Sequence, residues 1–423
     1  MKQLSTSGNT LAESLNLLAT RRFGTFWIAS LLSNIGTWAQ QVAQPWLLLS
    51  LGASPFLIGL DAFALGAPIW LLTLVGGALA DHADRRRVIT LFQSIQMLCP
   101  ILLVILLLTA AIQPWMVIVL SLIVGVTDAL SMPSFQSIVP SLVKHEQIAQ
   151  GLALNSTQFN LSRILGPAIA GILMVSVGAV GCFAVNAVSY LPFIAVALWI
   201  LPHTKLPVAA TNKSGSNILF SGVGNIISDP LLRGALLTVL TSSFLCGPLI
   251  VFCPVLVKDA LHGDARQFSI ALGAFGVGGL LGAVALLSVG TGHDLRRLSS
   301  WFAAGYGAIL VCAALNQWYW LLPILLVLAG LSMNASNISA NSLLQASASP
   351  LLRGQSVSLY MLAMRGGLSV GSLLTGLSVH LMGVRYALAL NGALALAAHI
   401  AIGRKWLISA LPGSSAPVAG KPS

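Results

Sequence analysis

Charged residues are scarce in this 423-residue chain. Only 7% of its residues are Asp, Glu, Lys or Arg, and only 10 residues are acidic. Hydrophobic residues make up 57% of the chain, and the mean hydropathy is +0.90. This composition excludes an ordinary water-soluble domain and favours a chain that crosses a membrane many times.

Cysteines and enzyme motifs are also sparse. The five cysteines all lie in apolar segments, without a Cys-x-x-Cys or Cys/His spacing typical of a metal site. The sequence has no Gly-x-Ser-x-Gly, His-Glu-x-x-His or Walker A motif. We therefore predict no metal, no cofactor and no enzymatic activity. Active transport by such a chain would use an ion gradient.

Long apolar runs fill most of the sequence. A membrane-spanning helix needs about 20 mostly apolar residues. The runs that meet this need are 23–49, 55–80, 88–110, 114–139, 151–178, 180–201, 231–257, 268–290, 299–315, 318–348, 354–381 and 384–404. We predict an all-α membrane protein with twelve transmembrane helices.

Composition also divides the chain into segments. Polar and proline-containing stretches separate two halves that each hold six apolar runs. The predicted segments are a cytoplasmic start with an amphipathic surface helix (1–22), a first bundle (23–201), a linker (202–230), a second bundle (231–404) and a disordered tail (405–423).

Lys and Arg are distributed unevenly between the connecting segments. With a cytoplasmic N-terminus, sixteen of the 21 fall on the cytoplasmic side and three on the other, while Arg163 and Arg365 lie inside helices. Cytoplasmic loops of membrane proteins carry such an excess. We predict that both termini are cytoplasmic. The net charge of +11 follows from this bias and needs no nucleic-acid partner.

One charged loop separates two apolar runs at residues 76–87, which read Gly-Gly-Ala-Leu-Ala-Asp-His-Ala-Asp-Arg-Arg-Arg. It resembles the signature loop between helices 2 and 3 of the major facilitator superfamily. Its Asp-Arg-Arg-Arg ending is similar to the secretion-effector branch, which includes siderophore and macrolide exporters. Residues 33–47 also resemble the first helix of that branch. The matching loop positions here are Gly77, Asp81, Asp84, Arg85 and Arg86.

The resemblance implies a fold and a function. It implies two pseudo-symmetric six-helix bundles in a bacterial cytoplasmic membrane and proton-driven export of a small molecule, with a monomer as the simplest assembly. In the family the loop acid braces the inner gate against the start of helix 11, which implies an Asp81–Arg353 contact here. The loop departs from the family pattern at His82 and Asp84, where Arg and Gly are usual.

A second motif lies in the fifth predicted helix. Residues 162–171 read Ser-Arg-Ile-Leu-Gly-Pro-Ala-Ile-Ala-Gly and resemble the antiporter motif of the superfamily, with Gly166, Pro167 and Gly171 in matching places. Other small residues stand where two further glycines are usual. The motif implies export by antiport, and close helix packing by small residues is the alternative.

Polar residues form a stripe on the first predicted helix. Asn34, Thr37, Gln41 and Gln44 recur at a spacing that places them on one helical face. Such a stripe should face the protein interior rather than lipid. It either lines a substrate cavity or forms hydrogen bonds between helices.

Three ionisable residues fall within helices of the first half. Asp61 lies about two turns from the outer end of helix 2, where we favour an acid that faces water, with a proton site as the alternative. Asp128 and Arg163 lie at matched depths of roughly 17 Å in helices 4 and 5. We predict that they face each other or share the central cavity. They form either a structural ion pair or a proton carrier with its partner.

The second half carries its own polar set. Asn334, Asn337 and Asn341 share a face of helix 10, which offers no acid to Arg365 in helix 11. Arg365 therefore binds an anionic or carbonyl group of the substrate, or it is satisfied by helix carbonyls and amides. The cavity-lining candidates are Asn34, Gln41, Arg163, Asn337 and Arg365, and the proton-carrying candidates are Asp128 and Asp61.

The two halves repeat each other at several positions. At an offset of 205, Gly166 and Gly171 match Gly371 and Gly376, and at an offset of 210 Asp84 matches Asp294. These matches fit two related bundles with a site between them at mid-membrane depth.

The expected partners are a small-molecule substrate, protons and the lipid bilayer. A facilitator or importer of the same fold and a non-transporting sensor or assembly partner stay open. Among exporters, drug efflux competes with a secreted metabolite such as a siderophore.

Overall fold

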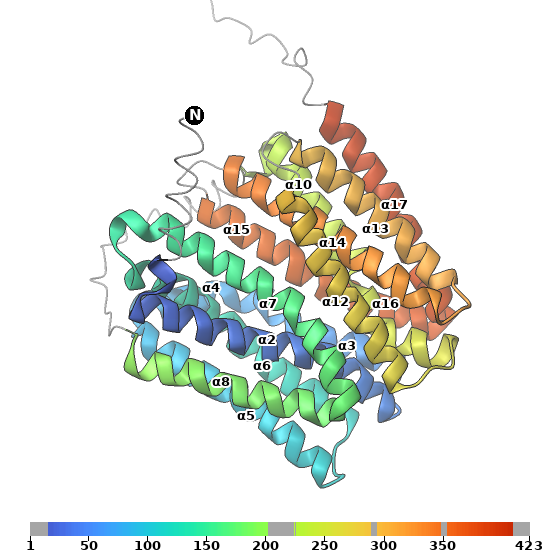
Figure 1. The fold of residues 1–423 in the computed structure, drawn as a ribbon, viewed down its shortest axis with the longest axis horizontal. Helices are drawn as coiled ribbons and strands as arrows, with labels where there is room; N and C mark the ends of the chain where they lie inside the picture. Colours follow the sequence, from blue (N-terminus) through green and yellow to red (C-terminus); the bar gives the residue numbers. More distant parts are fainter. Residues whose placement is uncertain (1–15, 202–223, 225, 289–293, 348–352, 409–423) are drawn as a thin grey trace, which may run out of the picture.

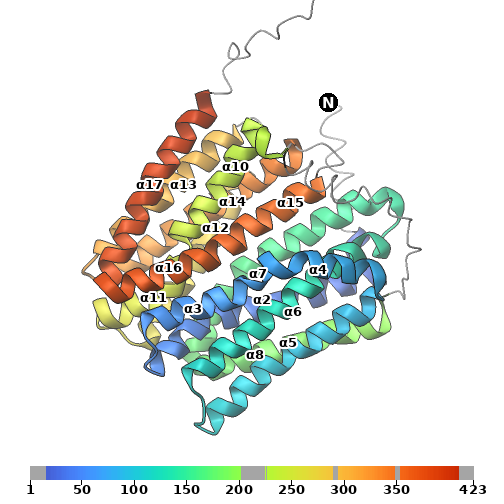
Figure 2. The ribbon, with the colours of Figure 1, turned by 180° about the vertical axis from the view of Figure 1, so that it is seen from behind.

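The computed structural model describes residues 16–201, 224, 226–288, 294–347 and 353–408, and the secondary structure within these ranges is helical. The helices form two bundles that lie side by side, one coloured blue to green and the other yellow to red (Figure 1). The same arrangement is seen from behind in Figure 2. The predicted all-α fold is therefore confirmed for the described residues.

The N-terminal bundle contains six of the predicted spans. Its helices are α2 (Arg21–Ser50), α3 (Pro55–Gly66), α4 (Pro68–His82), α5 (Arg85–Leu108), α6 (Pro114–Ile138), α7 (Ile148–Ser176) and α8 (Gly178–Trp199). The second span is divided into α3 and α4 at Ala67, because Pro68 lacks the amide hydrogen that a continuous helix needs.

The C-terminal bundle contains the other six spans. Its helices are α10 (Pro230–Thr241), α11 (Pro248–Val255), α12 (Ala265–Ser288), α13 (Leu295–Leu315), α14 (Leu321–Ser347), α15 (Arg353–Met361), α16 (Gly367–Met382) and α17 (Val384–Ile408). Three π-helical segments, Ser242–Cys246, Leu256–Ala260 and Leu362–Gly366, join or extend helices of the seventh and eleventh spans. Single π turns often mark functional positions in helices.

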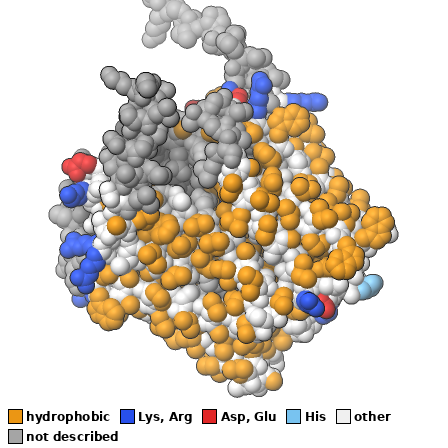
Figure 3. Space-filling model, in the orientation of Figure 1, with side chains coloured by type: hydrophobic (Ala, Val, Ile, Leu, Met, Phe, Trp, Pro, Cys, Tyr) orange, Lys and Arg blue, Asp and Glu red, His pale blue; other side chains and the backbone are white. Residues whose placement is uncertain are grey.

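Eleven described helical segments are long and apolar enough to cross a membrane. The remaining predicted span, α2, carries several amide side chains but packs against α7 and α8 within the same bundle. Exposed apolar side chains cover the middle of the visible face, while Lys and Arg lie near its edges (Figure 3). This surface suits a lipid environment.

The second bundle extends beyond its predicted last residue. Helix α17 continues to Ile408, so the chain stays helical beyond residue 404, where the last bundle was expected to end. Trp406 is 3% exposed and stands against Gly234 of α10, which explains the extra turn. The predicted surface helix and the linker fall mainly on residues 1–15 and 202–223, outside the described ranges.

The two bundles begin their third helices alike. The Asp84 side chain accepts a hydrogen bond from the backbone N–H of Arg86 at 3.1 Å, and Asp294 accepts one from Arg296 at 3.0 Å. Each aspartate thus caps the helix that follows it. The predicted match between Asp84 and Asp294 has a structural counterpart in these caps.

Candidate transport site

The two bundles meet closely at one end of the molecule. We call the end where α5 and α13 begin the arginine-rich end of the molecule. The end where α3 and α12 begin is called the opposite end. Across the bundle interface α3 packs on α16, as Figure 2 shows, and α7 packs on α12. Near the opposite end, a Cβ added to Gly59 would lie 2.5 Å from the carbonyl oxygen of Ser372. The backbones touch there.

The same contact is repeated by the other helix pair. A Cβ added to Gly171 of α7 would lie 2.9 Å from the carbonyl oxygen of Ser269. A Cβ added to Gly376 of α16 would lie 2.9 Å from the carbonyl oxygen of Pro55. Gly171 and Gly376 are the residues that match at the offset of 205. Two related glycine contacts therefore hold the bundles together at the opposite end.

An ion pair links the bundles between these ends. The guanidinium of Arg365, in the π-helical segment Leu362–Gly366, donates to the Asp128 carboxylate of α6. The Asp128 side chain is 37% exposed and that of Arg365 is 25% exposed. Arg365 also lies 5.7 Å from the ring centre of Phe159 of α7. Helix 10 offers no acid to Arg365, as predicted, but the interpretation of Arg365 as an arginine without an acidic partner is wrong, because Asp128 of the other half pairs with it.

Arg163 forms a second link across the interface. It is 8% exposed and donates to Asn334 of α14 at 3.0 Å and to the Met364 sulfur at 3.0 Å. Its Nε atom is buried without a hydrogen-bond partner among the described residues. Asp128 and Arg163 do not face each other, because each side chain reaches across to the opposite bundle, whereas the alternative that they share the central cavity stays a prediction.

The other predicted lining residues fall into different settings. Asn337 of α14 is 4% exposed, and its Oδ1 atom is buried without a partner in the described part of the chain. Asn34 is half-buried on α2. Gln41 lines a chamber inside the N-terminal bundle. The stripe on the first helix thus serves mainly an interior network of its own bundle.

Asp61 belongs to this interior network. It is 4% exposed and accepts hydrogen bonds from Gln44 at 2.7 Å and from Ser121 at 2.6 Å. The favoured interpretation, an acid facing water at the mouth of the protein, is wrong. Interhelical hydrogen bonds account for Gln44, and Gln40 extends them to Asn186 of α8 at 2.7 Å.

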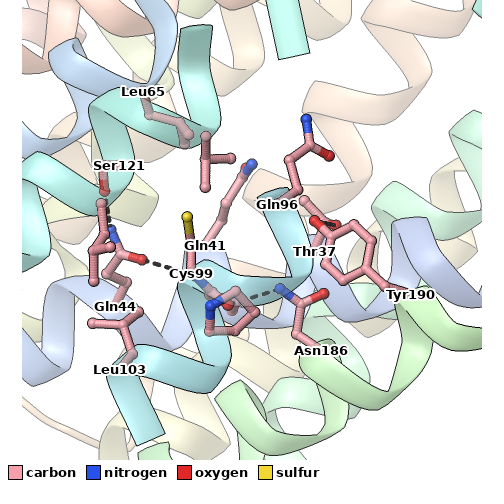
Figure 4. A pocket seen from close by; sticks show the side chains of 14 residues that line it. Thr37, Gln41, Gln44, Leu65, Gln96, Cys99, Leu103, Ser121, Asn186 and Tyr190 are labelled. Atoms are coloured by element: carbon pink, nitrogen blue, oxygen red, sulfur yellow. Dashed lines mark hydrogen bonds between the residues drawn. The ribbon is translucent and has the colours of Figure 1, made fainter. Parts of the chain in front are cut away.

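The chamber beside this network has a volume of about 20 Å³. Polar side chains from α2, α5, α6 and α8 line it together with a few apolar ones (Figure 4). Its polar lining includes Thr37, Gln41, Gln96, Ser121, Asn186 and Tyr190. The Thr37 and Tyr190 hydroxyls lie 3.2 Å apart. Amide and hydroxyl groups surround the chamber, so its lining suits a buried water molecule.

The charged loop makes contacts at the start of α5. Asp84 forms an ion pair with Arg87 at 3.8 Å, and Arg85 donates to the Ser137 carbonyl oxygen at 3.3 Å. That second contact ties the start of α5 to the end of α6. The side chains of Asp81 and Arg353 lie outside the described set, so their expected contact stays a prediction.

The glycines around these motifs do not all serve close packing. A Cβ on Gly76 would lie 2.7 Å from the Ala129 carbonyl oxygen, whereas one on Gly77 would meet nothing within 4 Å. In the antiporter-like motif, a Cβ on Gly166 would lie 2.3 Å from the Trp38 Cβ of α2. Pro167 is accommodated inside the continuous helix α7. The motif therefore brings α7 close to α2 at Gly166 and to α12 at Gly171.

Sequence reasoning missed several polar residues of the interior network. Ser121 and Tyr190 were not singled out, because each is an isolated polar residue in a long apolar run, and Asn186 was noted only as a position that repeats at the offset of 205. Spacing gave a signal only for the part of the network on the first helix, because Gln40 and Gln44 are one helical turn apart and hydrogen-bond at 3.3 Å. The π-helical placement of Arg365 had no sequence signal that we used.

Together, two six-helix bundles with charged links at their interface define a membrane transporter of the major facilitator fold. Solved structures support this fold. The nucleoside transporter NupG matches with a TM-score of 0.69 at 14% identity, covering 92% of this chain and 99% of that one. A bacterial homolog of the human lysosomal transporter Spinster matches with a TM-score of 0.65 at 16% identity, covering 92% and 98%.

The sequence profile of the transmembrane secretion effector family matches residues 12–416, so the chain belongs to that family of transporters. A staphyloferrin A transporter of Staphylococcus aureus is 25% identical over 363 residues, covering 85% of this chain and 90% of the relative. The enterobactin exporter EntS of Salmonella typhi is 26% identical over 326 residues, covering 72% and 76%. The predicted superfamily and branch are confirmed, and the chain is a transporter and not an enzyme.

Proposed function

We propose that this protein exports a small anionic metabolite of the siderophore type from the bacterial cytoplasm, in exchange for protons. The observation that carries the proposal is the Asp128–Arg365 pair, which joins the two bundles and remains partly exposed. The relatives named above are transporters of siderophores. Their names support the substrate class and, for enterobactin, the outward direction.

The direction of opening follows from packing and charge. The glycine contacts hold the bundles together at the opposite end, while water reaches the Asp128–Arg365 pair. We infer that water arrives from the arginine-rich end. The excess of Lys and Arg there supports a cytoplasmic location for that end. This state would load substrate from the inside, and rocking of the bundles would then expose the site to the outside.

The ion pair supplies a way to couple protons to substrate. Asp128 as a carboxylate holds Arg365, whereas a protonated Asp128 loses the charge that attracts it. A substrate carboxylate or phenolate binds the guanidinium of Arg365, while a hydroxyl group of the same substrate donates to the ionised Asp128 carboxylate. Arg163, held by Asn334, adds a second positive charge at the same interface. Protonation of Asp128 removes the charged acceptor and favours release of the substrate, so the proton and the substrate compete for Asp128.

The gating loop completes the cycle in this proposal. Asp81 ends the second span and Arg353 begins the eleventh, so both lie at the arginine-rich end. A contact between them would brace that end closed while the cavity faces outward. Asp81→Ala should then slow transport with little change in substrate affinity. A large loss of affinity at unchanged turnover would contradict this role.

Metabolite profiling of a deletion strain tests the function. Cell contents and medium are compared in the deletion and complemented strains under iron-replete and iron-starved growth. We expect an iron-chelating acid to accumulate in the deletion cells and disappear from the medium. A compound that remains in the medium and fails to enter would instead indicate import. No change in the cell contents or the medium would contradict metabolite export. Drug efflux would then be tested with a panel of toxic compounds.

A further inference from the structure

A buried carboxyl group lies inside the N-terminal bundle, apart from the interface. Asp61 on α3 is 4% exposed and is held by side chains of two other helices of its bundle. Gln44 of α2 donates to its Oδ2 atom, and Ser121 of α6 donates to its Oδ1 atom. No Lys or Arg nitrogen of the described residues forms an ion pair with it. An acid in this setting is costly to keep charged and is a candidate functional group.

The hydrogen bonds around Asp61 all run towards it. Asn186 donates to Gln40 at 2.7 Å, Gln40 donates to Gln44 at 3.3 Å, and Gln44 donates to Asp61 at 2.7 Å. Gln44 also donates to Ser121 at 2.6 Å, and Ser121 in turn donates to Asp61. Donors pointed at both carboxyl oxygens favour the ionised form, whereas burial favours the neutral form. The site can therefore hold either state.

The network ends close to the interface. Asn186 lies beside Tyr190 on α8, and the Tyr190 hydroxyl is near enough to Asp128 for an electrostatic interaction. Asp128 also follows Ser121 on α6 by seven residues, which places both on one helical face about 10 Å apart. Two carboxyl groups thus lie at the two ends of one polar path.

The chamber along this path can hold water. Its volume of about 20 Å³ exceeds the roughly 10–15 Å³ that one water molecule needs. Amide and hydroxyl groups of Gln44, Ser121 and Asn186 provide hydrogen-bond partners there, as Figure 4 shows. Side-chain amides do not readily give up protons. A water in this position would carry a proton between groups that the amides alone cannot connect.

We propose that Asp61 is a second proton-binding site and that it passes its proton to Asp128 through this chamber. The Asp61 acid gives a proton to a chamber water, that water gives one of its own protons to the Tyr190 hydroxyl, and Tyr190 gives its hydroxyl proton to the Asp128 carboxylate. Asp61 is left as a carboxylate held by Gln44 and Ser121. Asp128 becomes neutral and releases Arg365. The total charge stays constant, and the inference rests on the proposed role of Asp128.

Other titratable groups face the path and are part of any titration. They are Cys99 on α5, which lines the chamber, Tyr190 on α8, and Asp128 on α6. His380, near the end of α16, the helix packed against α3, is exposed. Only Asp61 and Asp128 among them are carboxylic acids. Carboxyl groups can be followed separately by infrared spectroscopy, because a protonated carboxyl has its own C=O stretch.

The test is infrared pH-difference spectroscopy of the full-length protein in lipid vesicles. We expect two carboxyl signals from within the N-terminal bundle of the unmodified protein, one from buried Asp61 and one from partly exposed Asp128. Asp61→Asn should remove one, Asp128→Asn should remove the other, and Glu146→Gln, which removes an exposed acid, should remove neither. Both signals surviving in Asp61→Asn would overturn the proposal. So would an Asp61 signal that responds to sodium at constant pH, because sodium and not a proton would then be the bound ion.

Two further measurements keep the test decisive. Ser121→Ala should shift the frequency of the Asp61 signal, whereas Ser131→Ala on the same helix should not. This comparison decides the matter if Asp61→Asn fails to fold. After a rapid pH drop confined to the side of the vesicle membrane away from the arginine-rich end, Asp61→Asn should slow protonation of Asp128 by about a hundredfold, the lower end of what a positioned proton donor contributes. An unchanged rate would overturn the transfer step. These readouts need no substrate, so they are independent of a failed export assay.

Discussion

Asp128 of the N-terminal bundle and Arg365 of the C-terminal bundle form an ion pair, although 237 residues separate them in the sequence. Both side chains keep partial access to water. A pair of this kind adds little to stability but can be broken and remade easily. This property suits a contact that must open once in every transport cycle.

The first prediction concerns the stability of that pair. Asp128→Asn or Arg365→Gln should lower the free energy of unfolding by only about 1 kcal/mol, because water can solvate the remaining charge. Thermal unfolding of the purified variants measures this. A loss of several kcal/mol in either variant would mean that the pair is a buried structural element, contrary to its exposure.

The Arg163–Asn334 contact should behave differently, because Arg163 is buried. Asn334→Leu leaves a buried guanidinium without its acceptor and should cost about 2–3 kcal/mol. Arg163→Met combined with Asn334→Leu should recover much of that loss. A double-mutant cycle on unfolding free energies measures the coupling, and strict additivity of the two single changes would contradict the contact.

The glycine contacts predict a conformational variant. Gly59→Leu places a bulky side chain where a Cβ already lies 2.5 Å from the Ser372 carbonyl, so the bundles should separate at the opposite end. The readout is thiol labelling of a cysteine at Val379, which is 4% exposed, in a protein without native cysteines. Labelling should become at least several times faster.

A matched control is available in the same kind of contact. A Cβ on Gly273 of α12 would meet nothing within 4 Å, so Gly273→Ala should leave the labelling rate of the Val379 cysteine unchanged. Equal rates for the Gly59→Leu variant and the unmodified background would mean that this contact does not hold the opposite end closed.

A pH prediction follows from the cap of α13. Partial burial disfavours the charge on Asp294, but hydrogen bonds and charge from Arg296 and nearby Arg297 outweigh it and hold the pKa below the ordinary 3.8. The ionised group therefore stabilises the fold above that pH, and the contribution is lost as the pH falls through the lowered pKa.

Asp294→Asn tests this directly, because Asn keeps the helix cap and removes only the charge. The variant should be about 0.5 kcal/mol less stable than the unmodified protein at pH 6. The difference should shrink as the pH falls below 3.8. Unfolding curves at several pH values measure it, and a difference that grows towards acid pH would reverse the assigned sign.

The architecture could be predicted from the sequence because it depends on average properties. Twelve apolar runs, the loop at residues 76–87 and the repeated positions define two bundles without any knowledge of contacts. The predicted pairing of Asp128 failed for a physical reason. Matched depth in adjacent helices says nothing about rotation around the helix axis, and the π turn at Leu362–Gly366 alters that rotation for Arg365.

Asp61 illustrates a second limit. Its distance from the helix end suggested contact with water, but Gln44 and Ser121 from two other helices enclose it. Such convergence of single polar residues from separate spans leaves no local pattern. The cap by Asp84, in contrast, follows from residues adjacent in the chain and could be anticipated from the repeat.

The most direct test of the account is transport by Asp128→Asn in vesicles with an imposed proton gradient, using the compound found by metabolite profiling. We predict that the variant exchanges labelled for unlabelled substrate at a rate close to that of the unmodified protein but does not accumulate it against a gradient. Continued accumulation against the gradient by Asp128→Asn would show that the coupled proton is carried elsewhere and would contradict the central role given to the Asp128–Arg365 pair.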